Sequence, residues 1–431
     1  MSLDIYGAFF VFWQNCHSLE WMEFSFHSFL LSETAFAVDE YIKKTKKGGK
    51  SMNEARVFAD EFQTSFAEEH ELMGFLRNRT KASAWMRKPT KELRLLPMDS
   101  EKAQKAIAAG IGDAEVISDT EKNTQLMLKT KEDYYPVRDC AIKTILNRAG
   151  VSGSGLNRLD KKNYARVINM CLQTAKGISL IRVADGKISA IHGGDYCDYK
   201  ILDTESVFQE TILYLEKNFP GFHYIPESGS YDHTMVTAMW ELSGQPELLQ
   251  SYQEALDDHG ICQRIYAPAL RLSTSDVAAK SVTLYPMLIC EGNNQTLNLG
   301  HPIRLEHSGE SDIEKFRQKL GYLYTRYKNA ISDIEKLLDI EINHPVNCLI
   351  GIMKDIRIGK KIGSKAVELY VAQHGEGTTT AHQLYYALNE VVFYAACNGA
   401  QGTRILNLEE QITKALVCDW KEYDLFGTVS W

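Results

Sequence analysis

The residues with the clearest capacity for chemistry form a short basic segment, residues 77–94. This segment holds seven Lys or Arg side chains and a single acid, Glu92, and Trp85 lies among them. Guanidinium and ammonium groups neutralise phosphates, and an indole can stack on an unpaired base. The segment therefore predicts binding of single-stranded nucleic acid, and of single-stranded DNA in particular. The side chains that would make the contacts are Arg77, Arg79, Lys81, Trp85, Arg87 and Lys88.

A solvated basic face is the alternative interpretation of this segment. Glu68, Glu69 and Glu71 precede the segment and could pair with its cations. A second basic cluster, between residues 354 and 365, admits the same two interpretations. The formal net charge of −8 argues against a dedicated duplex-DNA binder, because such proteins usually have a basic balance. Any contact with nucleic acid would therefore come from a local patch.

Three other motifs hold chemical groups but lack the context that a site needs. The segment His192–Asp198 gathers imidazole, carboxylate and thiol groups, yet metal ligands usually converge from more than one element. His374 and His382 do not match the H-E-x-x-H pattern of a metalloprotease. The glycine-rich run at 150–155 lacks the preceding strand and the following Lys of a phosphate-binding loop. We therefore predict no metal site and no cofactor, and no catalytic residue can be named.

The cysteines and the apolar runs indicate where the protein resides. There are nine cysteines, none of them in a C-x-x-C pair, and most lie in apolar runs such as Tyr285–Cys290. Buried reduced thiols behave as small hydrophobic side chains, so we expect a reducing compartment and a cytoplasmic protein. No run of about 20 apolar residues occurs, so we expect no helix that spans a membrane.

The first 51 residues differ from the rest. They are rich in Phe and Trp, and they end in the Lys- and Gly-rich run Lys43–Ser51 before Met52. A ribosome-binding site translated in frame would have this appearance, so one hypothesis is that Met52 is the true start. The alternative is a flexible basic linker behind an N-terminal helix pair. The intact mass of the protein from its native source would separate the two.

The elements that would position the candidate residues indicate an α+β fold. The core at about 230–340 is predicted to have the order β-α-β-β-β-α, an antiparallel sheet with packed helices. A helical C-terminal region follows. The predicted core elements are strands at about 234–242, 263–272, 282–290 and 296–305, a helix that begins at Pro246, and a long helix over about 313–338.

Ahead of this core, the dipeptide Asp185-Gly186 between two apolar runs predicts a β-hairpin over residues 178–191. The sequence leaves open whether this hairpin joins the core sheet. Helices are predicted at 53–76, 101–109, from Pro136 to Gly150, 161–175 and 204–217. The predicted regions are an extension at 1–51, a helical and basic region at 52–130, an α+β core at 131–340 and a helical region at 341–431.

Several stretches of the chain resemble one known family. They are Tyr134–Asp139, Leu272–Asp276, Leu284–Leu288, Leu297–Gly309 and the helix Thr379–Glu390. Over roughly residues 130–420 they are similar to the domain-of-unknown-function 932 family of phage- or plasmid-like proteins. The resemblance implies a mobile-element context and supplies no catalytic residues. The β-α-β-β-β-α order also resembles the core of RecT/Redβ-type single-strand annealing proteins, which is an analogy of fold alone.

These observations lead to three hypotheses about function. The leading one is a non-enzymatic protein of mobile-element DNA metabolism that binds or anneals single-stranded DNA. The most extended version of this hypothesis has the protein act as a homo-oligomer. The second is an enzyme that acts on nucleotides or nucleic acid, with its site near His192–Asp198 or His374–His382. The third is a structural or interaction protein, such as an antagonist of host defence.

Overall fold

The structure of the protein is a computed structural model. It describes residues 56–196, 198–261, 265–290, 296–300, 302–398, 400 and 402–431. The chain divides into two units at Val57 and Phe58, and the second unit, Phe58–Trp431, holds all the strands and α-helices of the described residues. The hypothesis about residues 1–51 and Met52 lies outside the described residues.

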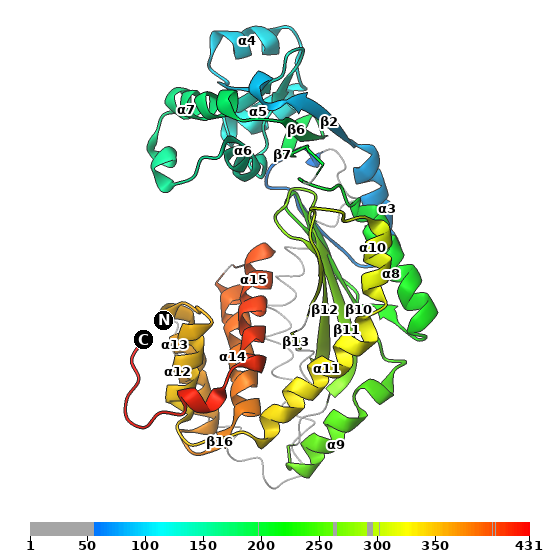
Figure 1. Ribbon diagram of the computed structural model, residues 1–431, viewed down its shortest axis with the longest axis vertical. Coiled ribbons are helices and arrows are strands. Elements are labelled where there is room, and N and C mark those ends of the chain that lie inside the picture. The colour runs from blue at the N-terminus through cyan, green and yellow to red at the C-terminus, as the bar shows by residue number, and fades with distance from the viewer. Residues whose placement is uncertain are drawn as a thin grey trace, which may run out of the picture. The chain divides into compact units, whose positions relative to one another are not determined.

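The fold is α+β, as predicted, and its largest part is an antiparallel sheet (Figure 1). The strands on its main path, in spatial order, are β1 (Gln63–Phe66), β9 (Gly229–Asp232), β10 (Val236–Glu241), β11 (Ile265–Thr274), β12 (Val282–Cys290) and β13 (Thr296–Asn298). Two short strands complete it: β8 (His223–Tyr224) pairs with β10, and β14 (Ile303–Leu305) pairs with β12.

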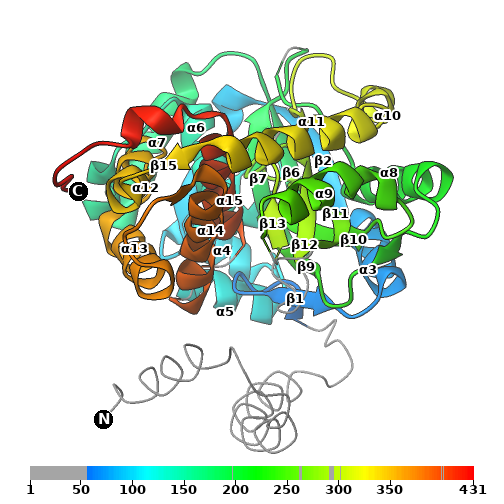
Figure 2. The ribbon, with the colours of Figure 1, turned by 90° about the horizontal axis from the view of Figure 1, so that it is seen from below.

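The two faces of this large sheet differ in character because side chains alternate along a strand. Trp240 and Leu270 are opposite each other in the register and face the main hydrophobic core. Phe208 of α8 (Thr204–Asn218) packs on Trp240 with ring centroids 6.1 Å apart. The opposite face carries Arg271, which pairs with Glu409 of α15 (Thr403–Ile412). Figure 2 shows the sheet between α8 on one side and α14 (Ala381–Cys397) and α15 on the other.

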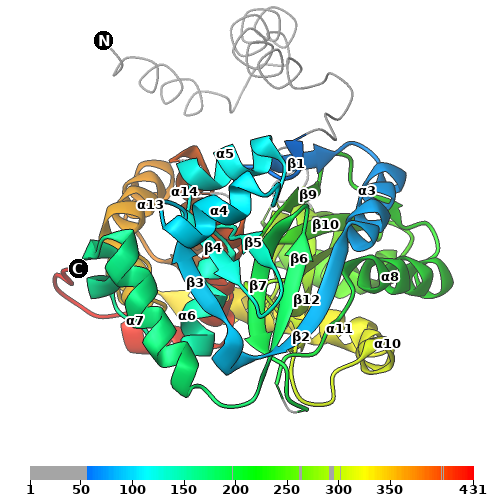
Figure 3. The ribbon, with the colours of Figure 1, turned by 90° about the horizontal axis from the view of Figure 1, so that it is seen from above.

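A smaller sheet holds the candidate site. Its order is β2 (Ser83–Pro89), β6 (Ile178–Ala184) and β7 (Lys187–Gly193). Helices α6 (Ala141–Ala149) and α7 (Lys161–Thr174) cover one face of this sheet (Figure 3). The side chains that β6 and β7 bury against these helices are Ile181, Ile188 and Ile191, with Met86 of β2 packed against them. These helices do not cover the other face of the small sheet, and that face contacts loops that connect strands of the large sheet.

The remaining elements flank these two sheets. Ahead of α6 lie a short helix-flanked sheet, β3 (Arg94–Pro97), β4 (Leu126–Lys129) and β5 (Tyr134–Pro136), and the helices α4 (Glu101–Ala108) and α5 (Ala114–Lys122). The later helices are α9 (Gln250–Asp258), α10 (Ile313–Leu320), α11 (Leu323–Lys336), α12 (Pro345–Asp355) and α13 (Lys360–His374). None of the described helices is long and apolar enough to cross a membrane.

Many predicted elements are confirmed. The β-α-β-β-β-α order holds from β10 to α11 when β13 and β14 are counted as one strand and α10 and α11 as one helix. Asp185 and Gly186 have φ values of 51° and 73°, as the predicted hairpin turn requires. Gly150 caps α6 in the left-handed conformation with φ of 66°. The hairpin does not join the core sheet, because β6 pairs with β2 and β7.

Four predicted elements are wrong. The segment 53–76 is not one helix, because Phe66 is buried on β1 and α3 (Glu69–Lys81) starts afterwards. The Glu71 carboxylate accepts hydrogen bonds from the backbone nitrogens of Ala67 and Glu68, at 3.1 and 3.3 Å. These bonds satisfy backbone N–H groups at the start of α3. In a helix that continued through these residues, the same N–H groups would instead bond to carbonyl oxygens of the preceding turn. The cap supplied by Glu71 therefore sets the start of α3, although the helical spacing of apolar residues begins earlier in the sequence.

The other three errors concern interruptions. Pro136 is the last residue of β5 and not the first of a helix, since α6 begins at Ala141. The segment 313–338 is split into α10 and α11 at Gly321, and 296–305 is split into β13 and β14. In each case the apolar spacing continues past a residue that interrupts the element. That residue is Pro136 before α6, Gly321 between α10 and α11, and Gly300 in the turn between β13 and β14.

Candidate nucleic-acid interface

The basic segment is divided between helix α3 and strand β2, and part of it is already paired with acids. Arg77 is exposed, and its Nε lies 3.0 Å from Glu205 Oε1 on α8. Lys88 Nζ lies 3.0 Å from Glu132 Oε2, and this contact raises the pKa of Lys88. The partners come from distant parts of the chain and not from Glu68, Glu69 or Glu71. These surface pairs contribute little to stability.

Arg79 lies inside the protein and not on its surface. Only 7% of the residue is exposed. Its NH1 pairs with Asp185 of the hairpin turn, and its Nε donates to Tyr231 Oη at 3.3 Å. Arg79 therefore ties α3 to the hairpin and to β9, and we do not count it among the groups that meet a phosphate.

Arg79 belongs to a larger buried network of charges. Asp185 also accepts from Arg138 NH2 at 3.4 Å. Lys187, which is fully buried, pairs with Asp60 at 2.8 Å and with Asp119. The charges of this network balance. It contains three cations, Arg79, Arg138 and Lys187, and three carboxylates, Asp60, Asp119 and Asp185. The balance favours a structural role for this network.

Two of the predicted cations remain accessible. Lys81, at the end of α3, and Arg87, on β2, are both exposed, and neither has an ion pair within the described ranges. Arg87 lies two residues from Trp85, so the two side chains project from the same face of β2. That strand is an edge of its sheet, because β6 is its neighbour on one side and no described strand pairs with it on the other.

Trp85 stands directly opposite Arg182 in the register of β2 and β6. Arg182 is 5% exposed, and its NH2 lies 2.8 Å from Asp276 Oδ2 in the β11–β12 connection. Asp276 Oδ1 accepts a second hydrogen bond from Thr204 Oγ1, the first residue of α8, at 2.7 Å. One carboxylate thus joins the small sheet to α8 and to the large sheet.

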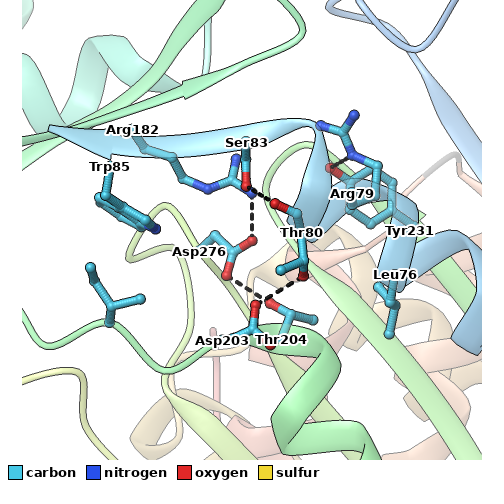
Figure 4. A pocket seen from close by; sticks show the side chains of 11 residues that line it. Leu76, Arg79, Thr80, Ser83, Trp85, Arg182, Asp203, Thr204, Tyr231 and Asp276 are labelled. Carbon is cyan, nitrogen blue, oxygen red and sulfur yellow. Dashed lines mark hydrogen bonds and ion pairs between the residues drawn. The ribbon is translucent and has the colours of Figure 1, made fainter.

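A small pocket opens at this junction (Figure 4). Its cavity volume is about 20 Å³, which is room for one or two water molecules. Trp85 and Arg182 lie on one side of it and Arg79 and Tyr231 on the other, with Asp276 below. The remaining lining residues are Leu76, Thr80, Ser83, Ile201, Asp203 and Thr204.

Two N–H donors of this lining have no acceptor. They are Arg79 NH2 and Arg182 Nε, which are buried and without a hydrogen-bond partner among the described residues. A buried donor without an acceptor costs about 1–3 kcal/mol. Neither atom has surface that solvent can reach, so the folded protein carries this cost itself.

Beside the pocket, aromatic rings stack behind Trp85. The Trp85 and Tyr199 centroids are 5.7 Å apart, and Tyr199 lies between His192 at 3.8 Å and His307 at 5.1 Å. Burial lowers the pKa of His192 to about 4 and also lowers that of His307. Both imidazoles keep a buried Nε2 without a partner among the residues described. Neutral rings therefore pack beside the indole, which is half-buried.

The other predicted motifs do not gather metal ligands in the described part of the chain. His192 turns toward Tyr199, whereas Asp198 accepts from the Asp195 backbone at 3.2 Å, and Cys197 lies outside the described residues. Among the residues that the structure describes, no three His, Cys, Asp or Glu side chains are grouped as metal ligands would be.

His374 and His382 do not converge either. His374 is exposed, with its Nδ1 at 2.7 Å from Gln383 Nε2. His382 is buried, with its Nε2 at 2.6 Å from the Tyr252 hydroxyl, and burial lowers its pKa to about 4. The glycine run is a joint, because the 3₁₀ turn Ser154–Arg158 follows the end of α6.

The sequence interpretation missed Arg182, Asp276 and Tyr199 as members of the site. A signal existed for one of them, because Arg182 is the only charged residue in the otherwise uncharged strand Ile178–Ala184. An arginine in a buried strand needs a partner. No comparable signal distinguishes Asp276, whose role depends on a fold-level contact with β6 and α8.

Comparisons with known proteins add no identity to this geometry. No family model matches the chain, and neither a curated protein nor a solved structure matches it.

Proposed function

We propose that the protein binds single-stranded nucleic acid at the Trp85 face of strand β2. One observation carries this proposal: Trp85 and Arg87 project from the same face of an edge strand beside a small pocket, and Arg87 is exposed with no ion pair among the described residues. An aromatic platform next to a cation is the arrangement that sequence-tolerant single-strand binding uses.

Neighbouring side chains support the proposal. Tyr196, three residues before Tyr199, is 75% exposed, and Lys200 Nζ lies 4.4 Å from its ring centroid. A second aromatic ring and a second cation are thus available close in sequence to the ring that packs on Trp85. The pairing of Arg77 and Lys88 with acids limits the phosphate contacts to a few residues, so we expect weak to moderate affinity.

The resemblance to phage- and plasmid-like proteins motivates the further proposal that this activity serves the DNA metabolism of a mobile element. The proposal extends to two further activities, which are annealing of complementary strands and assembly of several copies of the protein on one strand. Both would be measured by the rate of duplex formation and by the mass of the complex on a strand of defined length.

Fluorescence anisotropy with a labelled single strand and the full chain tests the proposal. Binding should weaken with salt, because phosphate contacts release counterions. Trp85→Ala should weaken binding about tenfold or more, since stacking contributes about 1–3 kcal/mol per base. Trp85→Phe should keep part of that affinity.

The matched control removes two exposed cations outside both basic clusters. They are Lys102 of α4 and Lys122 at the end of α5. The double variant Lys102→Ala/Lys122→Ala should bind as the unaltered protein does. Absence of binding at low salt, or equal losses in the control and in Trp85→Ala, would refute the proposed site.

A further inference from the structure

The second basic cluster, residues 354–365, forms a positive surface that the proposed function does not use. It spans the end of α12 and the start of α13, and it holds five cations and one acid, Asp355, in a chain of net charge −8. Four of the cations are exposed, have no ion pair within the described ranges and together form the α12–α13 patch. They are Lys354, Arg357, Lys360 and Lys361. A concentrated positive patch on an acidic protein attracts anions locally.

The local structure does not explain why cations stand at these positions. Arg357 has a φ of 63° and follows the last turn of α12, at a position where Gly is the usual residue. Lys360 and Lys361 are the first two residues of α13, and the positive end of the helix dipole disfavours cations there. A role at the surface therefore accounts for these side chains better than helix stability does.

An indole lies beside this patch. A Cβ atom added at Gly363 would clash with the six-membered ring of Trp431, so the ring rests against the beginning of α13. The preceding residue is also held at the patch, because the Ser430 carbonyl oxygen accepts a hydrogen bond from Lys354 Nζ at 3.1 Å. Trp431 is half-buried, so part of the residue remains accessible to a ligand.

The segment that leads to Trp431 is fixed by one buried side chain of α12. Asn347 Nδ2 donates to the carbonyl oxygens of Leu425 and Gly427 at 2.6 and 2.7 Å, and Asn347 Oδ1 accepts from the Val429 backbone nitrogen at 3.1 Å. The indole is therefore positioned before a ligand arrives. Such preorganisation reduces the conformational entropy that is lost on binding.

The indole narrows the class of anion that fits the patch. Cations alone attract acidic peptides, lipid head groups and nucleic acids alike, whereas a nucleic acid also brings bases that stack on an aromatic ring. The patch repeats the combination on β2, where Trp85 lies beside the exposed Arg87. We infer that the α12–α13 patch is a second contact site for single-stranded nucleic acid, with its cations on phosphates and Trp431 on a base.

The second site is separate from the first. Helix α13 and strand β2 lie well apart in Figures 1 and 3, and no residue belongs to both sites. The inference rests on the proposed function for the kind of ligand, yet each site can bind or fail alone. One chain with both sites would hold two short strands at once, or one longer strand at two places.

The test needs a readout that reports each site by itself. The full chain is labelled with 5-fluorotryptophan and titrated with a thymidine hexanucleotide, and the fluorine NMR resonances are followed. The variants Trp85→Phe and Trp431→Phe assign the two site resonances. We expect both resonances to shift, whereas those of Trp240 and Trp420 should stay in place because both residues are 0% exposed.

Removal of two cations of the patch should affect only the second site. Lys360→Ala/Lys361→Ala should weaken the Kd read at Trp431 about tenfold at low salt and reduce its salt slope by about 1.4, since each phosphate contact on a single strand contributes about 0.7. The Kd read at Trp85 should be unchanged. The matched control is Lys102→Ala/Lys122→Ala, which should leave both Kd values as they are.

The possible outcomes separate the two proposals. A Trp431 resonance that stays fixed while Trp85 reaches saturation would overturn the inference and leave the proposed function standing. A Trp431 shift that polyglutamate produces with equal affinity would also overturn it, because the patch would then be a general anion surface. A shift at Trp431 alone would support the inference and overturn the site on β2. No shift at either residue would overturn both.

Discussion

His192 and Tyr199 stack almost parallel, with ring centroids 3.8 Å apart and 8° between their planes. His192 belongs to the small sheet and Tyr199 to the connection that leads into α8. A neutral imidazole packs well on a phenol ring, whereas a buried imidazolium would need a counter-charge. Among the described residues, His307 and Arg182 further lower the pKa of His192, and a hydrogen bond with the Asp276 backbone opposes them without supplying a counter-charge. The contact is therefore sensitive to acid.

We expect stability to fall with decreasing pH through the titration of His192. Burial lowers its pKa from 6.5 to about 4. Between these values the unfolded chain binds a proton that the folded protein does not, so the free energy of unfolding decreases as pH falls through this window. The loss reaches about 3 kcal/mol below pH 4. Urea unfolding at several pH values measures it.

His192→Phe should make this dependence shallower by about one proton, because the ring stack stays and the titrating group is gone. Tyr199→Phe is the control, since it leaves every histidine in place and should keep the original slope. An unchanged slope in His192→Phe would show that other groups, such as the buried His382 and His307, account for the acid sensitivity.

The buried network around Lys187 should be essential for folding. Lys187 is fully buried between Asp60 and Asp119. Lys187→Met would leave Asp119 without a cation in the network and Asp60 with only the contact to Arg138 NH1 at 3.9 Å, and such a change costs about 3–5 kcal/mol. The control is Lys105→Met, which breaks the exposed pair with Glu101 at 2.6 Å and should cost less than about 0.5 kcal/mol. Similar midpoints of chemical unfolding for the two variants would contradict this role.

The elements of the fold that follow from local chemistry could be predicted from the sequence. The Asp185-Gly186 turn needs positive φ at both residues, and only a few dipeptides supply it. Strand β12 is buried at every residue and reads as an apolar run. The helix α8 starts where Asp203 accepts from the Ser206 backbone at 2.9 Å, which its sequence pattern indicates.

The candidate site could be predicted only in part, because its partners are far apart in the sequence. Trp85 and the exposed Arg87 could be selected as an aromatic residue and a cation in one basic segment. The burial of Arg79 could not, since it depends on Asp185, which lies 106 residues later. The contact of Arg182 with Asp276 spans 94 residues. Composition and spacing do not reveal such pairings.

A close backbone approach at Gly244 gives a prediction about packing. A Cβ atom at this position would lie 1.8 Å from the carbonyl oxygen of Pro220, so the connection after α8 would have to shift. Gly244→Ala should therefore destabilise the protein by about 1–3 kcal/mol. Gly359→Ala is the control, because no atom lies within 4 Å of its added Cβ and its φ is −67°. A thermal unfolding midpoint that drops only for Gly244→Ala would confirm the contact.

Arg79 and Arg87 belong to the same basic segment, yet we expect their loss to have opposite effects. Arg87 is exposed and without an ion pair in the described part of the chain. Arg87→Ala should leave the free energy of unfolding within about 0.5 kcal/mol of its original value. It should weaken single-strand binding and reduce the slope of log affinity against log salt by about one.

Arg79→Ala, in contrast, should act on folding. It would leave Asp185 with only the longer contact to Arg138 and would remove a hydrogen bond to Tyr231, and removal of one partner of a buried pair costs about 3–5 kcal/mol. The affinity of its folded fraction, measured where the variant remains native, should keep the original salt slope. A reduced slope in Arg79→Ala with unchanged stability would mean that this guanidinium reaches a phosphate after all, and the site would then have to include the interior of the pocket.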